Sequence, residues 1–183
     1  MEIWDVYDID RQLTGKRMDR GAEFEDDAYT SVMHICIFNS KGEMLIQQRQ
    51  SFKRTWPNLW DLSVGGHVEA GETSRMSAER ELFEELGLKR DLSDVRAHFT
   101  INFVHGFDDY YFFEEDLDLE SLKLQEEEVQ AVKWASREEI KRMIKDGEFI
   151  NYYPSLIDFI FDSRRNYGAH VDETGKYLRC VRK

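Results

Sequence analysis

Residues 66–88 read GHVEAGETSRMSAERELFEELGL, in which a glycine-containing turn is followed by a carboxylate-rich helical pattern. Positions i, i+3 and i+4 of a helix share one face, so Glu81, Glu84 and Glu85 project from neighbouring positions. Clustered carboxylates without nearby cations are poorly stable until protons or a metal neutralise them. Because hard divalent cations prefer oxygen ligands, the segment predicts a metal site.

Both ends of this helix are marked in the sequence. Thr73 or Ser74 can cap its N-terminus, and Glu72 suits the positive end of the helix dipole as a structural carboxylate. Gly87 stands where a left-handed residue would end the helix. An apolar stripe at helical spacing is expected to seat the helix on a core, and it consists of Ala78, Leu82 and Leu86.

The spacing of the whole segment carries a family resemblance. Glycine, five residues, glutamate, seven residues and then Arg-Glu-apolar-x-Glu-Glu-x-Gly-apolar is the signature of the Nudix hydrolases, and residues 66–88 agree at every fixed position. The resemblance implies a loop–helix–loop that binds Mg²⁺ or Mn²⁺ at a pyrophosphate. It also implies a pyrophosphohydrolase, an enzyme acting on acid anhydrides, whose small-molecule substrate is a nucleoside diphosphate linked to another moiety.

The predicted metal ligands come from the glycine segment and the helix. We expect Glu81 and Glu85 to bind the metal through their side chains and Gly66 to bind it through its carbonyl. Glu84 either supplies another ligand or pairs with Arg80, which precedes it by one helical turn. Glu84, Glu85 and Arg80 are therefore the predicted catalytic residues of this helix. Gly65, Gly66 and Gly71 are expected to turn the backbone sharply.

A further carboxylate from a loop beyond the helix is implied by the family resemblance, as a ligand or general base. Glu128 is included among the predicted catalytic residues. The sequence leaves the choice open among five candidates, which are Asp108, Asp109, Glu126, Glu127 and Glu128.

Substrate recognition is less closely determined. Three basic residues are candidates to meet phosphates, namely Arg49, Lys53 and Arg54. Candidates for an aromatic wall against a ring of the substrate are Trp60, Trp56, Phe52, Tyr110 and Tyr111. Arg49 equally suits an ion pair with an acidic residue, and aromatic residues at strand positions more often belong to a core. His34 lies in an apolar strand pattern and is interpreted as a core histidine, while a role for His67 stays open. The substrate itself is not identified.

Composition narrows the class of partner. Among 183 residues, 37 acidic side chains outnumber 25 basic ones and give a formal charge of −12. This charge argues against non-specific nucleic-acid binding, which needs a basic surface. A polyphosphate would also be repelled unless metal ions intervened. With only two cysteines, no signal-peptide pattern and no apolar stretch of membrane-spanning length, we expect a cytoplasmic protein without a membrane partner.

The order of expected elements predicts an α+β sandwich with a mixed sheet between helices. The Nudix resemblance implies the same architecture, a Nudix-type α/β/α sandwich with a mixed central sheet. We divide the chain into an N-terminal hairpin extension (1–28), a Nudix domain (29–160) and a C-terminal extension (161–183). The extensions either pack on the sheet or build a homodimer. Besides the metal-binding helix, helices are expected over residues 136–145 and 153–165. Strands are expected over residues 29–39, 43–49, 62–64, 95–104, 110–114 and 129–134, with a turn at 106–109, a loop at 117–128 and a terminal strand pair within 166–183.

Two alternative functions remain to be compared with hydrolysis. Residues 38–72 resemble isopentenyl-diphosphate isomerase, a Nudix-fold enzyme, through an Asn-x-Lys-Gly turn, a Lys-Arg-Thr-Trp-Pro loop and a tryptophan before the glycines. That resemblance places Gly65 where the isomerase has an acid–base cysteine. It also finds no early metal-binding histidines, since His34 is the only histidine before His67. We therefore favour a hydrolase from the isomerase-like branch. The second alternative is a nucleotide-binding module without catalysis.

Overall fold

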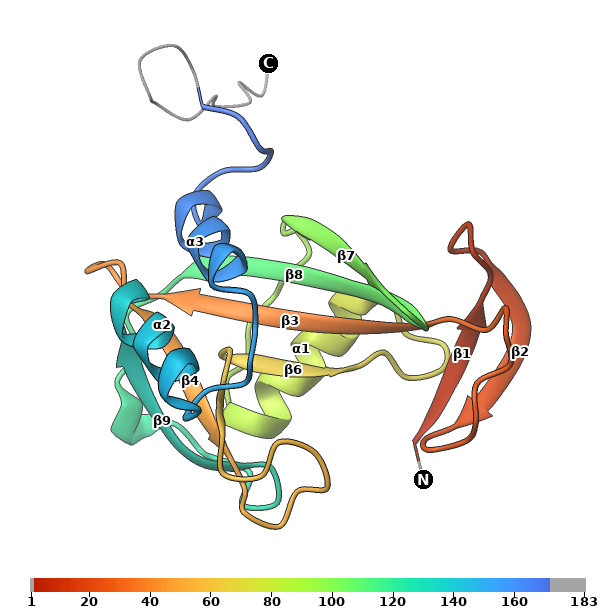
Figure 1. Ribbon diagram of the computed structural model, residues 1–183, viewed down its shortest axis with the longest axis horizontal. Coiled ribbons are helices and arrows are strands. Elements are labelled where there is room, and N and C mark those ends of the chain that lie inside the picture. Colours follow the sequence, from red (N-terminus) through yellow and green to blue (C-terminus); the bar gives the residue numbers. More distant parts are fainter. Residues whose placement is uncertain (1, 172–183) are drawn as a thin grey trace.

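The computed structural model describes residues 2–171, which form a central sheet with helices on both faces and a separate N-terminal hairpin (Figure 1). The helices are α1 (Ser74–Leu86), α2 (Arg137–Asp146) and α3 (Pro154–Ser163), and a short 3₁₀ helix spans Leu119–Ser121. The strands are β1 (Ile3–Tyr7), β2 (Leu13–Asp19), β3 (Thr30–Phe38), β4 (Met44–Arg49), β5 (Trp60–Asp61), β6 (Val64–His67), β7 (Phe99–Phe103), β8 (Gly106–Glu114) and β9 (Val129–Ala135).

The central sheet is mixed, as expected. Its main path runs β5-β4-β3-β8-β7, with β6 also pairing to β3 and β9 pairing to β4. Strands β3 and β8 run parallel over their whole length, from Thr30 opposite Gly106 to Phe38 opposite Glu114. The other pairs of this sheet are antiparallel. The predicted α+β sandwich with a mixed central sheet is thus confirmed.

Strand β3 divides its side chains between two cores because successive residues of a strand point to opposite faces. Met33 and Ile35 pack with Leu82 of α1. Cys36 and Phe38 pack on the other face with residues of α2 and α3. This alternation holds α1 on one side of the sheet and the C-terminal helices on the other.

The N-terminal hairpin lies beside the sheet as a two-stranded unit (Figure 1). Strands β1 and β2 pair antiparallel, which confirms the hairpin expected in this region. Trp4 and Val6 are buried, and an antiparallel bridge between Tyr7 and Tyr29 ties the hairpin to the start of β3. The hairpin therefore has a defined position next to β6 and the beginning of α1, where the amide of Gly71 donates to Asp5 at 2.6 Å.

The glycine segment is a strand rather than a sharp turn. Gly65 and Gly66 belong to β6 and pair with His34 and Met33 of β3, and neither has a positive φ. Of the glycines expected to turn here, only Gly71 does so, with φ 88°. The prediction was wrong because a glycine can also be required by a close neighbour rather than by a turn.

The expected turn at residues 106–109 was wrong as well. Those residues form the first half of β8, opposite residues 30–33 of β3, and the chain reverses just before Gly106 instead. β7 begins at Phe99, four positions later than the start predicted at Val95. Pairing of β8 with β3 and of β7 with β8 determines these boundaries, and local residue preferences do not report such pairing.

The C-terminal elements follow the prediction as far as they are described. α2 begins after the capping residue Ser136 and ends at Gly147, and α3 begins at Pro154. The loop expected at 117–128 contains the 3₁₀ helix. The strand pair expected within 166–183 lies largely outside the described residues, and residues 166–170 contain no strand. Among the described helices, none is long and apolar enough to span a membrane.

Candidate active site

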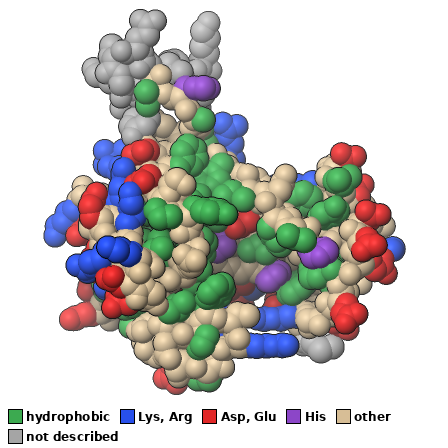
Figure 2. All heavy atoms as spheres, viewed as in Figure 1, with side chains coloured by type: hydrophobic (Ala, Val, Ile, Leu, Met, Phe, Trp, Pro, Cys, Tyr) green, Lys and Arg blue, Asp and Glu red, His purple; other side chains and the backbone are tan. Residues whose placement is uncertain are grey.

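A polar cleft of about 430 Å³ lies between α1, the N-terminal hairpin and the loops at one end of the sheet. Figure 2 shows this face, with histidine side chains in and around a central hollow. The predicted site residues that line the cleft are Gly66, Arg80, Glu81, Glu84, Glu85, Arg49, Lys53 and Glu128. Residues from four separate parts of the chain therefore meet at one cavity.

Helix α1 has the boundaries that its sequence predicts. The side chain of Thr73 accepts a hydrogen bond from the amide of Met76 at 3.2 Å. Gly87 adopts φ 67°, and its amide donates to the carbonyl of Phe83 at 3.0 Å. Leu82 and Leu86 are completely buried. With both ends and the apolar face held, the carboxylates of this helix keep a constant orientation toward the cleft.

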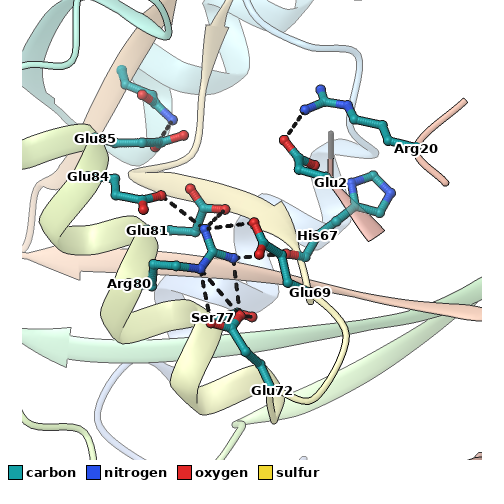
Figure 3. Close-up of polar contacts among 11 residues, drawn as sticks. Glu2, Arg20, His67, Glu69, Glu72, Ser77, Arg80, Glu81, Glu84 and Glu85 are labelled. Atoms are coloured by element: carbon teal, nitrogen blue, oxygen red, sulfur yellow. Dashed lines mark hydrogen bonds and ion pairs between the residues drawn. The ribbon is translucent and has the colours of Figure 1, made fainter. Parts of the chain in front are cut away.

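Arg80 lies at the centre of the carboxylate group of α1 (Figure 3). Its Nε and Nη2 atoms donate to Glu72 at 3.1 and 3.2 Å, and Nη1 donates to Glu81 and Glu84 at 3.0 Å each. Burial lowers the pKa of this guanidinium, but the hydrogen bonds of Glu72 and the nearby carboxylates outweigh it and raise the pKa. The expected Arg80–Glu84 pair is confirmed, and Arg80 acts as a clamp for carboxylates.

Among the carboxyl groups of this helix, those of Glu81 and Glu85 have raised pKa values. Burial is the main cause that raises the pKa of Glu81 to about 7. Glu85 is only 4% exposed, and burial together with repulsion by Glu81 raises its pKa well above the usual value. The amide of Gln47 donates to Glu85 at 3.0 Å. Glu84 differs from both, since its side chain is 45% exposed.

Gly66 lies directly against the helix. A Cβ atom at this position would collide with the carboxylate of Glu81 and would lie 3.0 Å from its Cγ. Only glycine therefore allows β6 to approach α1 so closely. The close approach brings a strand backbone and a half-buried carboxylate together, which is the reason for glycine that the sequence interpretation missed.

These residues suit a divalent cation by the chemistry of their oxygen atoms. Glu85 is a buried carboxylate and Glu81 a half-buried one, and Arg80 and Gln47 compensate them only in part, so an added cation would stabilise their charged forms. Within residues 2–171, no three His, Cys, Asp or Glu side chains are already gathered into a metal-binding group. The residues present fit a hard cation that takes its other ligands from phosphate oxygens and water, as Mg²⁺ does.

The opposite wall of the cleft carries basic side chains. Lys53 pairs with Glu128, and both line the cleft. Arg49 donates to the carbonyl of Thr55 at 3.2 Å and lies 3.7 Å from the carboxylate of Asp61, so the ion pair expected as one reading is present. Both cations are therefore paired with carboxylates, and an anionic substrate would have to compete with Glu128 and Asp61 for them.

Trp60 is placed differently from the expectation. It does not line the cleft but packs against the core formed with α2 and α3, and Lys133 lies 4.8 Å from the centre of its indole ring. Trp56 lines the cleft instead and is 51% exposed, with an unusual positive φ of 52°. The sequence does not distinguish the two tryptophans, and only the path of the loop decides which one faces the cavity.

The five candidate loop carboxylates lie in different surroundings. Glu128 lines the cleft, whereas Glu126 and Glu127 are exposed to solvent and do not line it. Asp108 faces His34 at 2.8 Å. Asp109 is buried outside the cleft, where it pairs with Arg11 and accepts hydrogen bonds from Ser74 and Thr100 at 2.6 Å.

Similarity to known proteins identifies the family of this chain. A family model described as NUDIX domain matches residues 28–155. The chain belongs to the NUDIX family. An uncharacterized Nudix hydrolase of Listeria monocytogenes is 48% identical over 153 residues, covering 84% of this chain and 90% of the relative. Nudix hydrolase 3 of Arabidopsis thaliana is 34% identical over 179 residues, covering 87% of this chain and 23% of the plant protein.

Solved structures share the Nudix fold. A Deinococcus radiodurans protein superposes with a TM-score of 0.69 at 22% identity, covering 87% of this chain and 97% of that one. A MutT protein from Methanosarcina mazei gives a TM-score of 0.55 at 25% identity, covering 73% and 93%. The isopentenyl-diphosphate Delta-isomerase of Salmonella heidelberg is 38% identical, but only over 65 residues, or 35% of this chain. The isomerase resemblance is therefore confirmed as a partial one.

Several residues of the Nudix cleft were missed by the sequence interpretation. Glu2 and Arg20 pair with each other at its edge and come from the two ends of the hairpin (Figure 3). Trp4 of the same hairpin stacks on His67 with ring centres 3.9 Å apart. No local pattern marks these hairpin residues as belonging to a site. Other lining residues were also not anticipated, among them Asp61, Gln125, Ile150 and Tyr152.

Proposed function

We propose that this Nudix protein hydrolyses a diphosphate bond in a nucleoside-diphosphate-linked or related small molecule, with Mg²⁺ or Mn²⁺ as cofactor. The observation that carries the proposal is the meeting of Glu81, Glu84 and Glu85 with Arg49 and Lys53 in one cleft. Carboxylates suit the metal, and the cations opposite suit phosphate oxygens. Family membership supports hydrolysis as the reaction. The residues of the cleft support a phosphate anhydride as the bond that is hydrolysed.

The site residues have different proposed roles in this reaction. Glu81, Glu85 and the carbonyl of Gly66 would hold the cation, with Glu84 as the exposed carboxylate that can join them. When bound, the cation supplies a Lewis acid for phosphate oxygens and activates water. Arg80 holds the carboxylates in position, and its catalytic contribution is therefore indirect. The predicted catalytic role of Glu128 is to accept a proton from the attacking water once substrate has drawn Lys53 away.

The surroundings of the reaction are part of the same proposal. The formal charge of −12 disfavours nucleic acid as the substrate and favours a small molecule whose charge is screened by the cation. Few cysteines favour the cytoplasm. Assembly as a homodimer stays a hypothesis for the hairpin and the C-terminal residues, and sedimentation or light scattering would measure it.

The Glu85→Gln variant tests the metal site. This change keeps the shape of the side chain and the contact with Gln47 but removes a charge, so we expect hydrolysis to fall at least 100-fold while the fold is retained. Phosphate release would be followed with Mg²⁺ and a panel of nucleotide sugars, ADP-ribose, NADH, dinucleoside polyphosphates, nucleoside triphosphates and isopentenyl diphosphate. Turnover at the wild-type rate would remove Glu85 from the mechanism.

The same panel separates the alternatives. An allylic product from isopentenyl diphosphate would indicate an isomerase, and binding without turnover would indicate a non-catalytic module. The isomerase alternative is not supported at Gly65, the position where the isomerase has its acid–base cysteine. A Cβ atom there would lie 2.8 Å from Cδ2 of His34 and leave no room for a longer side chain. Hydrolysis is thus the reaction that the cleft favours.

A further inference from the structure

One part of the cleft carries a chain of polar side chains that the proposed hydrolysis leaves without a role. His34 Nδ1 lies 2.8 Å from Asp108 Oδ1, and His34 Nε2 lies 3.3 Å from the hydroxyl of Tyr152. The same hydroxyl donates to Asp61 Oδ1 at 2.9 Å. His34, Asp61 and Tyr152 line the cleft, although they come from β3, β5 and the segment before α3.

Asp61 has one carboxylate oxygen that is poorly satisfied. The residue is only 6% exposed. Oδ1 accepts hydrogen bonds from the amide of Leu62 at 2.8 Å and from Tyr152. The nearest cation to Oδ2 is Nη1 of Arg49 at 3.7 Å, which is too long for a hydrogen bond, and nothing else within residues 2–171 donates to Oδ2. Asp61 lines the cleft, so this oxygen is free to accept a hydrogen bond from a ligand that binds there.

His34, which contacts Tyr152 in this chain of polar groups, is closely packed. The ring of His34 stacks on Tyr110 with centres 5.2 Å apart and lies so close to Gly65 that no side chain fits there. Gly65 precedes Gly66, whose backbone lies against the carboxylate of Glu81. The polar chain is therefore adjacent to the place where the diphosphate is proposed to bind, and it faces whatever is attached to that diphosphate.

We propose that Asp61, held by Tyr152 and His34, accepts a hydrogen bond from a hydroxyl or N–H group on the organic part of the substrate. This inference rests on the proposed function and narrows it to diphosphates whose organic part carries such a donor near the phosphates. A hydrocarbon diphosphate leaves Oδ2 unpaired and is disfavoured, since sites built to hydrogen-bond a group discriminate strongly against analogues that lack it. Asp61 touches the substrate, whereas Tyr152 and His34 are positioning residues.

The Asp61→Asn variant tests this contact because the amide keeps the shape and an acceptor for Tyr152 while the second oxygen is replaced. We expect kcat/KM for ADP-ribose and ATP to fall about 10-fold or more, by loss of a charge-assisted hydrogen bond, while activity on isopentenyl diphosphate is unchanged. Comparison with 2′,3′-dideoxy-ATP and GTP identifies the donor. Loss of the effect on the dideoxy compound assigns a ribose hydroxyl, and a change confined to one base assigns a base N–H group.

A matched pair of tyrosine variants separates positioning from general stability. Tyr152→Phe is expected to reduce the same selectivity about 3-fold or more, since Asp61 loses the hydroxyl that orients it. Tyr153→Phe, next in the chain and 81% exposed, should behave as wild type. An equal fall of kcat/KM for all probes in Asp61→Asn, or a wild-type preference for isopentenyl diphosphate, would overturn the inference. Hydrolysis of none of the probes would instead refute the proposed function on which it rests.

Discussion

Arg80 shows how one side chain can organise a group of like charges. Its planar guanidinium donates at once to Glu72, Glu81 and Glu84, in directions that a single ammonium group does not reproduce. Without it, the carboxylates of α1 would repel one another and turn toward solvent. The residue is therefore expected to affect metal binding and stability together.

The Arg80→Lys variant tests this role. Lysine keeps the charge but loses the fork of donors, so we expect a loss of about 1–3 kcal/mol in the free energy of unfolding and a reduced affinity for Mg²⁺. Denaturant unfolding and calorimetric Mg²⁺ titration measure the two effects. Arg137→Lys is the matched control, because Arg137 pairs with Asp162 on the far side of the sheet at 2.5 Å. Equal effects of the two variants on Mg²⁺ affinity would contradict the clamp.

Among the secondary-structure elements, α1 is the one whose limits depend most clearly on local sequence. Its N-terminal amide is satisfied by Thr73, and its C-terminal carbonyls are satisfied by the amides of Gly87 and Leu88. Such caps act within a few residues, which is why the sequence alone predicts them. The strands differ, because their boundaries at Gly65 and Gly106 depend on pairing with β3.

Removing the N-terminal cap of α1 gives a prediction about stability. Thr73→Ala loses the acceptor for the amide of Met76 and is expected to lower the free energy of unfolding by about 1 kcal/mol. Thr73→Ser keeps the oxygen and should remain close to wild type. Thermal or denaturant unfolding of the three proteins would check the order, and a serine variant as unstable as the alanine variant would argue against capping.

The stability of the whole molecule is expected to depend on pH because folding buries histidine side chains. The ring of His98 lies between Phe112 and Tyr167, at 4.4 and 4.3 Å between ring centres, and its Nδ1 accepts the amide of Phe112 at 3.2 Å. Burial, with a smaller contribution from Arg96, lowers the pKa of His98 to about 4. This packing favours the neutral ring in the folded protein.

A change in stability follows between pH 6.5 and 4. In this window the unfolded chain binds a proton at His98 with a pKa near 6.5, whereas the folded protein does not, so stability decreases as pH falls. We expect His98 to contribute about 1–2 kcal/mol to this decrease, after allowance for the partly exposed ring. Denaturant unfolding at several pH values would measure it. His98→Asn, which retains an acceptor, should show a shallower slope; an unchanged slope would exclude His98 as the source.

The sequence by itself determined the carboxylate-rich helix α1, its two ends, its buried stripe and the face that carries Glu81, Glu84 and Glu85, since helical spacing and caps are local properties. It also determined the mixed sandwich through the order of its elements. These features account for the family and for the chemistry expected of it.

Only the tertiary structure decided which other residues reach the cleft. It placed Trp56 rather than Trp60 at the cavity, separated Glu128 from Asp109, and brought Asp61 to Tyr152 across 91 positions of sequence. Such choices depend on how loops and distant strands pack, and no short sequence pattern encodes that packing. The proposed contact with the group attached to the diphosphate is made by these distant residues, which is why the sequence predicts the reaction more closely than the substrate.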